Sequence, residues 1–129
     1  MSGGTVICIV DDDPSVRRAL ARLVRSCGLG VETFASASEY LDAEHPDGVS
    51  CVVLDVYLGH VSGLDLREKI VAQKDHPPVI LMTAHDDATT RERIARSGAP
   101  GYLRKPFEAS ALLSAIGAAI GRNLELPSP

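Results

Sequence analysis

Short apolar runs alternate along this chain with longer segments in which apolar positions recur at helical spacing. The runs lie at residues 6–10, 31–34, 51–54, 79–82 and 102–104. Most of them have the length and the Val, Ile and Leu content of strands that are buried on both faces, as in a parallel sheet. The pattern therefore predicts five strands, each separated from the next by a helix.

Helix signals fill the stretches between these runs. We expect helices at residues 14–27, 36–41, 62–74, 86–97 and 108–120. Asp13 suits an N-cap, Pro14 suits the first helical position, and Gly28 suits the end of the first helix. Ser36 and Glu39 form a capping-box pattern at the start of the second helix.

The two C-terminal helices have unusual apolar content. The helix expected at residues 86–97 offers a core little more than Ile94 and two alanines, so it should be weakly anchored and able to move. The last helix carries more apolar surface than one core-facing stripe requires. Its extra surface, around Leu113 and Ala118, is either a face for a second copy or a partner, or a part of the core.

Five βα units of this length imply an α/β fold with a doubly wound parallel sheet and helices on both faces. Right-handed crossovers and a strand order of 2-1-3-4-5 fit best, since the first and third strands then flank the switch point. We expect one domain over residues 1–121. Residues 122–129 are interpreted as a C-terminal tail or the start of a linker.

Composition narrows the classes of protein to consider. The chain of 129 residues is long enough for one domain with a proper core. Its net charge of -4 gives no electrostatic reason to expect direct nucleic-acid binding by this segment. No apolar run approaches the roughly 20 residues that span a bilayer. The N-terminus lacks the basic and apolar regions of a signal peptide, which indicates a cytoplasmic protein without a membrane role.

Cysteine and histidine give no ligand pattern in the sequence. The chain contains three cysteines, in apolar surroundings and without a CxxC pair: Cys8, Cys27 and Cys51. Buried free thiols in a reducing compartment fit better than a disulfide or a zinc site. Three histidines show no ligand spacing and are expected at the surface: His45, His60 and His76.

Residues able to carry chemistry stand where four of the strands end. Asp11 and Asp12 follow the first run, Asp55 follows the third, Thr83 the fourth and Lys105 the fifth. In a parallel sheet these ends share one edge, where open α/β sheets place their chemistry. Two carboxylates about 5 Å apart repel by roughly 3 kcal/mol at an effective dielectric near 20, so three of them call for a cation. Oxygen-only ligands favour Mg²⁺, whereas Ca²⁺ normally takes more oxygens.

The set suits transfer of a phosphoryl group. Asp55 is the expected nucleophile, since a carboxylate can attack phosphorus to give an acyl phosphate. Lys105 can pair with the incoming phosphoryl oxygens, and Thr83 can donate a hydrogen bond to another of them. Taken alone, Thr83 fits a β-branched strand residue and Lys105 fits a solvated lysine. Their joint occurrence at strand ends favours the chemical interpretation, while Asp13 is better explained as a helix cap.

Four segments closely resemble the motifs of the receiver domain of bacterial two-component response regulators. They are Val10-Asp11-Asp12-Asp13, Leu54-Asp55, Leu81-Met82-Thr83-Ala84 and Leu103-Arg104-Lys105-Pro106-Phe107. Their order and approximate spacing match the family, and the resemblance covers residues 5–120. The sequences around Thr83 and Lys105 are most similar to those of the FixJ-type branch.

The resemblance implies a flavodoxin-like (βα)₅ fold and a phosphoprotein that signals in a phosphorelay, with no enzymatic activity beyond self-phosphotransfer and autodephosphorylation. It implies that Asp55 accepts a phosphoryl group from a histidine kinase. It also implies that Mg²⁺, for which Mn²⁺ can substitute, is held by Asp11, Asp12, Asp55 and the backbone carbonyl of Tyr57.

The resemblance further implies a conformational switch. Thr83 and Lys105 would contact the phosphoryl group, Lys105–Pro106 would be a cis peptide, and the rotamer of Tyr102 would follow Thr83. The surface formed by residues 86–97, the fifth strand and the last helix would then change shape for its partner. That partner would be a second phosphorylated copy or a C-terminal output domain, for example a transcriptional one.

Three residues depart from the family pattern or need a separate interpretation. Gly59 stands where the family usually has Pro, so residues 58–62 should form a looser loop. Tyr57 is large for a position beside a phosphoryl group, and we hypothesise that it shields the acyl phosphate from water. His85, at the other flanking position, either lies exposed in a loop or helps to position a water.

Two alternatives come from other classes. A phosphatase of the haloacid-dehalogenase type is suggested by residues 11–15, which resemble its DxDx(T/V) motif, and by the acidic pair Asp86-Asp87. That family places its lysine before the acidic pair, whereas Lys105 follows it, and it usually needs a longer chain with a cap. An FMN-binding flavodoxin would need a Ser/Thr/Gly-rich phosphate loop after the first strand, which the sequence lacks.

Overall fold

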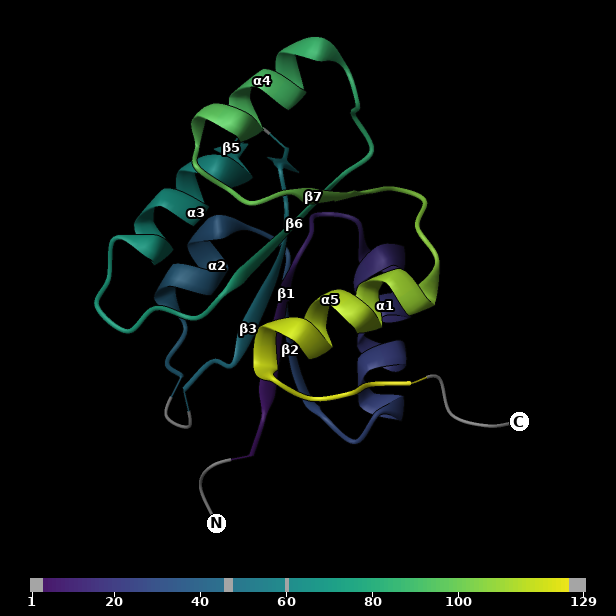
Figure 1. The fold of residues 1–129 in the computed structure, drawn as a ribbon. Helices are drawn as coiled ribbons and strands as arrows, with labels where there is room; N and C mark the ends of the chain where they lie inside the picture. Colours follow the sequence, from purple (N-terminus) through teal and green to yellow (C-terminus); the bar gives the residue numbers. More distant parts are fainter. Residues whose placement is uncertain (1–3, 46–47, 60, 126–129) are drawn as a thin grey trace.

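A parallel sheet runs through the middle of the protein and has helices on both faces (Figure 1). The computed structural model describes residues 4–45, 48–59 and 61–125. The strands of the sheet are β1 (Val6–Val10), β2 (Gly30–Phe34), β3 (Cys51–Asp55), β6 (Val79–Thr83) and β7 (Tyr102–Arg104). Their spatial order is β2-β1-β3-β6-β7, and every neighbouring pair is parallel. This is the predicted order 2-1-3-4-5, so the predicted fold class is confirmed.

The helices follow the predicted segments closely. They are α1 (Pro14–Ser26), α2 (Ala37–Asp42), α3 (Gly63–Val71), α4 (Ala88–Arg96) and α5 (Ala109–Ile120). The Asp13 carboxylate accepts a hydrogen bond from Ser15 N at 2.8 Å, and Ser36 Oγ accepts one from Glu39 N at 3.1 Å. The predicted caps therefore begin α1 and α2. Among the described residues, no helix is long and apolar enough to cross a membrane.

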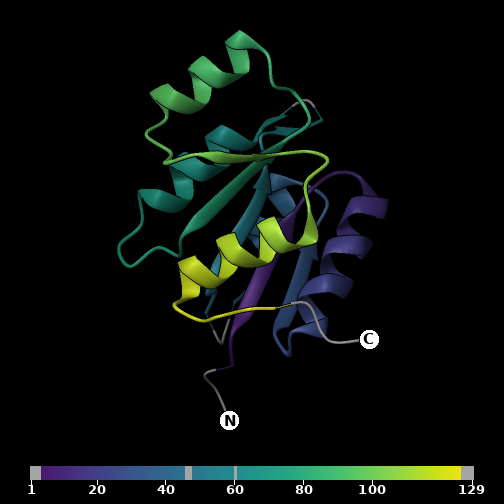
Figure 2. The same cartoon turned by 45° about the vertical axis from the view of Figure 1, so that its right-hand side comes forward.

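The core has two layers because the sheet is covered on both sides (Figure 2). Alternate residues of β1 point to opposite faces, as the period of a strand requires. Ile7 and Ile9 pack with α1 and α5, whereas Cys8 and Val10 pack with α2, α3 and α4. Every residue of β3 is buried, which explains why this central strand is a continuous apolar run.

The segment after β3 differs from the loop that was predicted. Strands β4 (Tyr57–Leu58) and β5 (Val61–Ser62) form a short antiparallel hairpin. Gly59 takes a φ of 65° in its turn, a conformation that glycine adopts easily and that the ring of proline forbids. Two-residue strands are too short to leave a periodic signal, so the sequence did not reveal them.

The residues after α5 fold back onto the domain. Arg122 N donates to Gly117 O at 2.9 Å, and Leu124 packs against the apolar layer under α1 and α5. The Sγ atom of Cys27, at the end of α1, lies 3.7 Å from the carbonyl oxygen of Glu125. Residues 122–125 are therefore packed against the domain.

The burial of individual side chains confirms some of the expectations from the sequence and corrects others. Leu113 is buried and Ala118 is exposed. Of the two interpretations of this surface, a position in the core is therefore correct for Leu113 and wrong for Ala118. Cys8 and Cys51 are buried free thiols as predicted, but Cys27 is only half-buried.

His76 is exposed as expected, and His60 lies outside the described residues. The expectation of a surface position for His45 is wrong, because its side chain is 18% exposed and packs against Phe34 and Tyr40.

Candidate functional site

Acidic side chains from β1 and β3 surround one lysine at the C-terminal edge of the sheet. Lys105 Nζ donates to Asp11 Oδ2 at 2.6 Å and to Asp55 Oδ2 at 2.8 Å. Carboxylate oxygens of Asp11, Asp12 and Asp55 lie within 4.8 Å of one another. The structure thus brings together four residues that the sequence singled out at three separate strand ends.

Strand register explains why the two buried carboxylates meet. Val10 of β1 is paired with Leu54 of β3, so the next residues, Asp11 and Asp55, leave adjacent strands side by side. The turn after β1 is then fixed by hydrogen bonds. Asp11 Oδ1 accepts from Asp13 N at 2.9 Å, and Arg17 Nη1 donates to the carbonyl oxygen of Asp11 at 2.7 Å.

Asp55 is nearly buried and both of its carboxylate oxygens have partners. Oδ1 accepts from the backbone N–H of Tyr57 at 2.9 Å, and Oδ2 accepts from Lys105. Burial raises the pKa of Asp55, and so does the negative charge of Asp11, whereas the bonds from Lys105 and from Tyr57 N–H favour the ionised form. For Lys105, burial opposes the charged form, but its hydrogen bonds with Asp11 and Asp55 raise its pKa. The lysine therefore stays protonated.

The charge balance of the cluster fits a divalent cation. One ammonium faces two buried carboxylates, and Asp12, which is exposed, adds a third. Carboxylate oxygens are the ligands that Mg²⁺ prefers, and Mg²⁺ commonly takes only a few protein ligands and keeps several waters. The donor set of Asp11, Asp12 and Asp55 therefore fits Mg²⁺.

A hollow in the surface gives access to Asp55. It has a volume of about 320 Å³ and is lined by Asp12, Asp55, Tyr57, Gly59, Ala84 and His85. The Tyr57 and His85 rings pack edge to face with their centroids 4.5 Å apart. His85 is exposed, as one of its two interpretations required. The Tyr57 hydroxyl lies 2.7 Å from Thr90 Oγ1 of α4, so one side chain forms a wall of the hollow and also contacts α4.

Thr83 is fully buried at the end of β6 and is engaged with its own loop. Its Oγ1 accepts from the backbone N–H of His85 at 2.9 Å, while its carbonyl oxygen accepts from Lys105 N at 2.8 Å. The structure therefore places Thr83 next to the backbone of Lys105. Its hydroxyl is hydrogen-bonded to the backbone of His85 and not to the carboxylate of Asp55.

Tyr102 lies half-buried on β7 and holds the loop before α4. Its hydroxyl donates to the carboxylate of Asp86. This hydrogen bond lowers the pKa of Asp86 and raises that of Tyr102. Arg104 and Arg91 pair with the same carboxylate at 3.2 and 3.5 Å. The Lys105–Pro106 peptide is cis, as the resemblance implied.

Gly63 was not among the predicted site residues, yet it packs directly against the backbone of Asp55. Its N–H donates to Val56 O at 2.6 Å, and a Cβ atom built on it would lie 1.9 Å from the carbonyl oxygen of Asp55. Only glycine fits there. A glycine directly after Ser62, the N-cap of α3, was the available signal. Thr90 was also missed, because its partner Tyr57 is 33 positions away along the chain. Asp86 was noted only for the phosphatase alternative, and its contact with Tyr102 was not foreseen.

The fold and the edge site define a class of protein, and the comparison with known families agrees. Residues 7–117 match the family model of the response regulator receiver domain. The chain therefore belongs to this family, as the sequence motifs predicted, and is a receiver domain of the two-component type. This is a signalling domain and not a classical enzyme, so the phosphatase and FMN-binding alternatives are set aside.

Particular relatives place the chain more closely within the family. It is 42% identical over 118 residues to nodulation protein W of Bradyrhizobium diazoefficiens, covering 92% of this chain and 52% of the relative. It is 39% identical to the transcriptional regulatory protein FixJ of Azorhizobium caulinodans, covering 91% of this chain and 56% of the relative. The chain thus spans about half the length of these relatives.

A solved structure gives the same result for the fold. The response regulator receiver protein from Burkholderia phymatum superposes with a TM-score of 0.81 and is 38% identical in sequence. The match covers 95% of this chain and 99% of that protein. The similarity therefore extends over the whole receiver fold.

Proposed function

We propose that Asp55 accepts a phosphoryl group from a histidine kinase in a Mg²⁺-dependent reaction in the bacterial cytoplasm. The observation that carries the proposal is a nearly buried carboxylate that shares one lysine with Asp11 and opens into a solvent-accessible hollow. A buried acidic pair with a single counter-ion is costly for the fold, and such groups are typical of functional sites. The hollow gives a donor a route to that carboxylate.

The residues of the cluster have separate roles in the transfer. A carboxylate oxygen of Asp55 bonds to phosphorus as the bond from phosphorus to the donor's imidazole nitrogen breaks, and that nitrogen keeps the electron pair. Asp11, Asp12, Asp55 and the carbonyl of Tyr57 would hold Mg²⁺, which supplies charge neutralisation for the phosphoryl oxygens. Lys105, 2.8 Å from Asp55 Oδ2, is placed to pair with a phosphoryl oxygen once the acyl phosphate forms.

The switch begins with the new charge at Asp55. A phosphoryl group adds roughly two negative charges, which attract the Lys105 ammonium and the Thr83 hydroxyl. Thr83 would give up its hydrogen bond with His85 N and leave space into which Tyr102 repacks. Tyr102 would then release Asp86, and the surface formed by α4, β7 and α5 would change. Such couplings are typically about 1–3 kcal/mol, enough to shift a population.

The changed surface of α4, β7 and α5 needs a partner that binds it. Because the chain spans about half the length of its relatives, we propose that a C-terminal output domain completes the regulator. FixJ of Azorhizobium caulinodans is a transcriptional regulatory protein, so a transcriptional output is the proposed one. A phosphorylation-dependent homodimer through α4, β7 and α5 is the proposed intermediate step, with DNA contact left to the output domain.

Incubation with acetyl phosphate, with and without Mg²⁺, tests the chemistry by intact-mass spectrometry. The wild type should gain the mass of one phosphoryl group only when Mg²⁺ is present, and Asp55→Asn should gain none. Asp13→Asn is the matched control, because asparagine caps α1 as well as aspartate and Asp13 lies outside the cluster. A modified Asp55→Asn protein, or an unmodified wild type, would contradict the proposal, and so would steady turnover of an aryl phosphate.

A further inference from the structure

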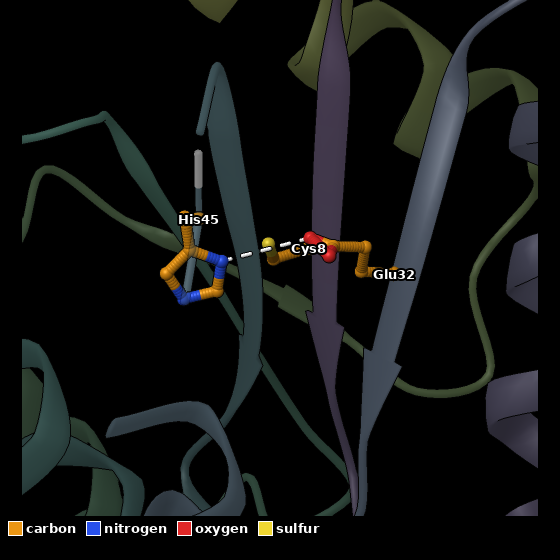
Figure 3. Close-up of side chains that lie close together, drawn as sticks. All are labelled: Cys8, Glu32 and His45. Carbon is orange, nitrogen blue, oxygen red and sulfur yellow. Dashed lines mark ion pairs between the residues drawn. The ribbon is translucent and has the colours of Figure 1, made fainter. Parts of the chain in front are cut away.

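A second group of metal-ligating side chains lies on the face of the sheet that α2 covers. Cys8 of β1 and Glu32 of β2 are partners in the strand register, so their side chains leave the same face. Figure 3 shows the ring of His45, which follows α2, on one side of the Cys8 sulfur and the Glu32 carboxylate on the other. One donor atom from each residue lies within 4.8 Å of the other two, and His45 Nδ1 is 3.6 Å from Glu32 Oε2.

The contacts of the His45 ring resemble those of a histidine that binds a metal ion. Its Nε2 lies 3.4 Å from the carbonyl oxygen of Tyr40, to which it can only donate. In the neutral ring the lone pair is then on Nδ1, which is buried and has no hydrogen-bond partner among the described residues. The rings of Phe34 and Tyr40 pack against the imidazole. Metal-bound histidines typically donate their second ring N–H to a carbonyl in this manner.

We propose that Cys8, Glu32 and His45 form a binding site for Zn²⁺ or a similar divalent transition metal, with water as a fourth ligand. One sulfur, one nitrogen and one oxygen suit a borderline-soft ion such as Zn²⁺ rather than Mg²⁺. A thiolate and a carboxylate carry two negative charges, which balance the ion. Cys8 is buried, whereas the Glu32 side chain is 42% exposed, so water would approach the site from the side of Glu32.

Closing the site needs only small movements of side chains. Ligand atoms around tetrahedral Zn²⁺ lie about 2.0–2.3 Å from the ion and hence roughly 3.5 Å from one another. Donors that are already within 4.8 Å therefore have to approach by about 1 Å. The bound ion would tie β1, the edge strand β2 and the segment after α2 together. This site is separate from the oxygen-only cluster at the C-terminal edge.

Metal binding must displace a proton from sulfur. Burial raises the pKa of Cys8 to about 12, and the charges of Glu32 and Cys51 add to the effect. The thiol is thus protonated in the metal-free protein, and binding should release a proton. Proton release gives a second readout that does not depend on any activity of Asp55.

Titration with Co²⁺ in place of Zn²⁺, with Mg²⁺ in excess to occupy the acidic cluster, tests the proposal. The wild type should show sulfur-to-cobalt charge-transfer absorption that saturates at one ion per chain, and Zn²⁺ should abolish it. Cys8→Ser should lose the absorption. Glu32→Gln and His45→Gln should weaken binding by at least about tenfold. Both positions are only partly buried, so these two variants remain informative if Cys8→Ser fails to fold.

Matched controls separate this site from others in the chain. Cys51→Ser removes a buried thiol from a neighbouring strand, and His76→Gln removes an exposed histidine; both should keep the absorption. If wild-type protein gives no sulfur-to-cobalt absorption and releases no proton, His45 and Glu32 form only an ion pair and the proposal is wrong. Absorption that Cys51→Ser removes and Cys8→Ser retains would also overturn it.

Discussion

Tyr57 is the residue that connects Asp55 with helix α4. Its backbone N–H donates to Asp55, its ring packs against His85, and its hydroxyl lies 2.7 Å from Thr90 Oγ1. A smaller residue would keep the first contact and lose the other two. The side chain therefore lines the hollow that leads to Asp55 and also touches α4.

We expect Tyr57→Ala to speed the loss of the phosphoryl group from Asp55 several-fold, because the missing ring lets water approach the acyl phosphate. Tyr57→Phe keeps the ring and loses only the hydroxyl contact with Thr90, so its rate should stay near that of the wild type. The measurement is the decay of the phosphorylated mass after removal of acetyl phosphate. An unchanged decay in Tyr57→Ala would disprove the shielding hypothesis.

At the scale of single residues, the sequence predicted the residues at strand ends and missed those defined by their neighbours. Asp11, Asp55 and Lys105 could be placed because a parallel sheet collects its strand ends at one edge. The contact of Thr90 with Tyr57, 33 positions away, and that of His45 with Glu32, 13 positions away, could not be predicted in this way. Side chains that act through distant partners leave no local pattern.

Helix α4 buries few apolar side chains, and its sparse apolar content predicts that it is weakly anchored. Its buried residues are Thr90 and Ile94, whereas the longer α1 buries Leu20, Ala21 and Val24. Polar contacts at its ends supply part of its attachment. Asp87 caps it by accepting from Thr90 N at 2.7 Å, and Arg67 Nη1 donates to Ser97 O at 2.8 Å. Contacts of this kind can be exchanged at little cost in free energy.

Hydrogen exchange followed by mass spectrometry should show α4 amides exchanging faster than those of α1 in the unphosphorylated protein. The reason is that opening α4 exposes fewer buried apolar groups. Ile94→Ala should speed exchange in α4 further, since truncating a buried Ile typically costs about 2–5 kcal/mol, and should leave α1 nearly unchanged. Equal protection of α1 and α4 would contradict the idea that α4 is loosely held.

At the scale of elements, capping residues predicted where helices begin better than apolar periodicity did. Asp13 and Ser36 begin α1 and α2 as expected, because a side-chain cap is a local interaction. Helix α4 begins at Ala88, two residues later than predicted, since Asp87 is its cap. The β4–β5 hairpin was missed because its strands are two residues long.

Residues 122–125, which the sequence analysis interpreted as part of a tail or the start of a linker, pack against the domain. Leu124 packs against the layer under α1 and α5, and Arg122 Nη1 donates to Thr5 Oγ1 at 3.3 Å. A Cβ atom on Gly117 would lie 2.4 Å from the carbonyl oxygen of Arg122, so this close approach requires a glycine in α5. Apolar periodicity ends with α5, which is why the sequence gave no sign of this contact.

A chain that ends at Gly121 should be less stable than one that ends at Glu125. The shorter chain exposes apolar surface that Leu124 covers, and partial loss of one leucine contact amounts to about 1–2 kcal/mol. Urea denaturation followed by circular dichroism would measure the difference, with the chain ending at Glu125 as the control. Equal free energies of unfolding would show that residues 122–125 contribute nothing to the fold and would favour the boundary at residue 121.

The contact between Thr5 and Arg122 also bears on engineering of the domain. The two ends of the packed chain meet there, on residues that are separate from the Asp55 hollow. Chains whose ends lie together tolerate circular permutation when the new ends fall in an exposed loop. Residues 72–76, between α3 and β6, are exposed. Opening the chain there would leave the sheet edge that carries Asp55 intact and free the old ends for a short peptide bridge.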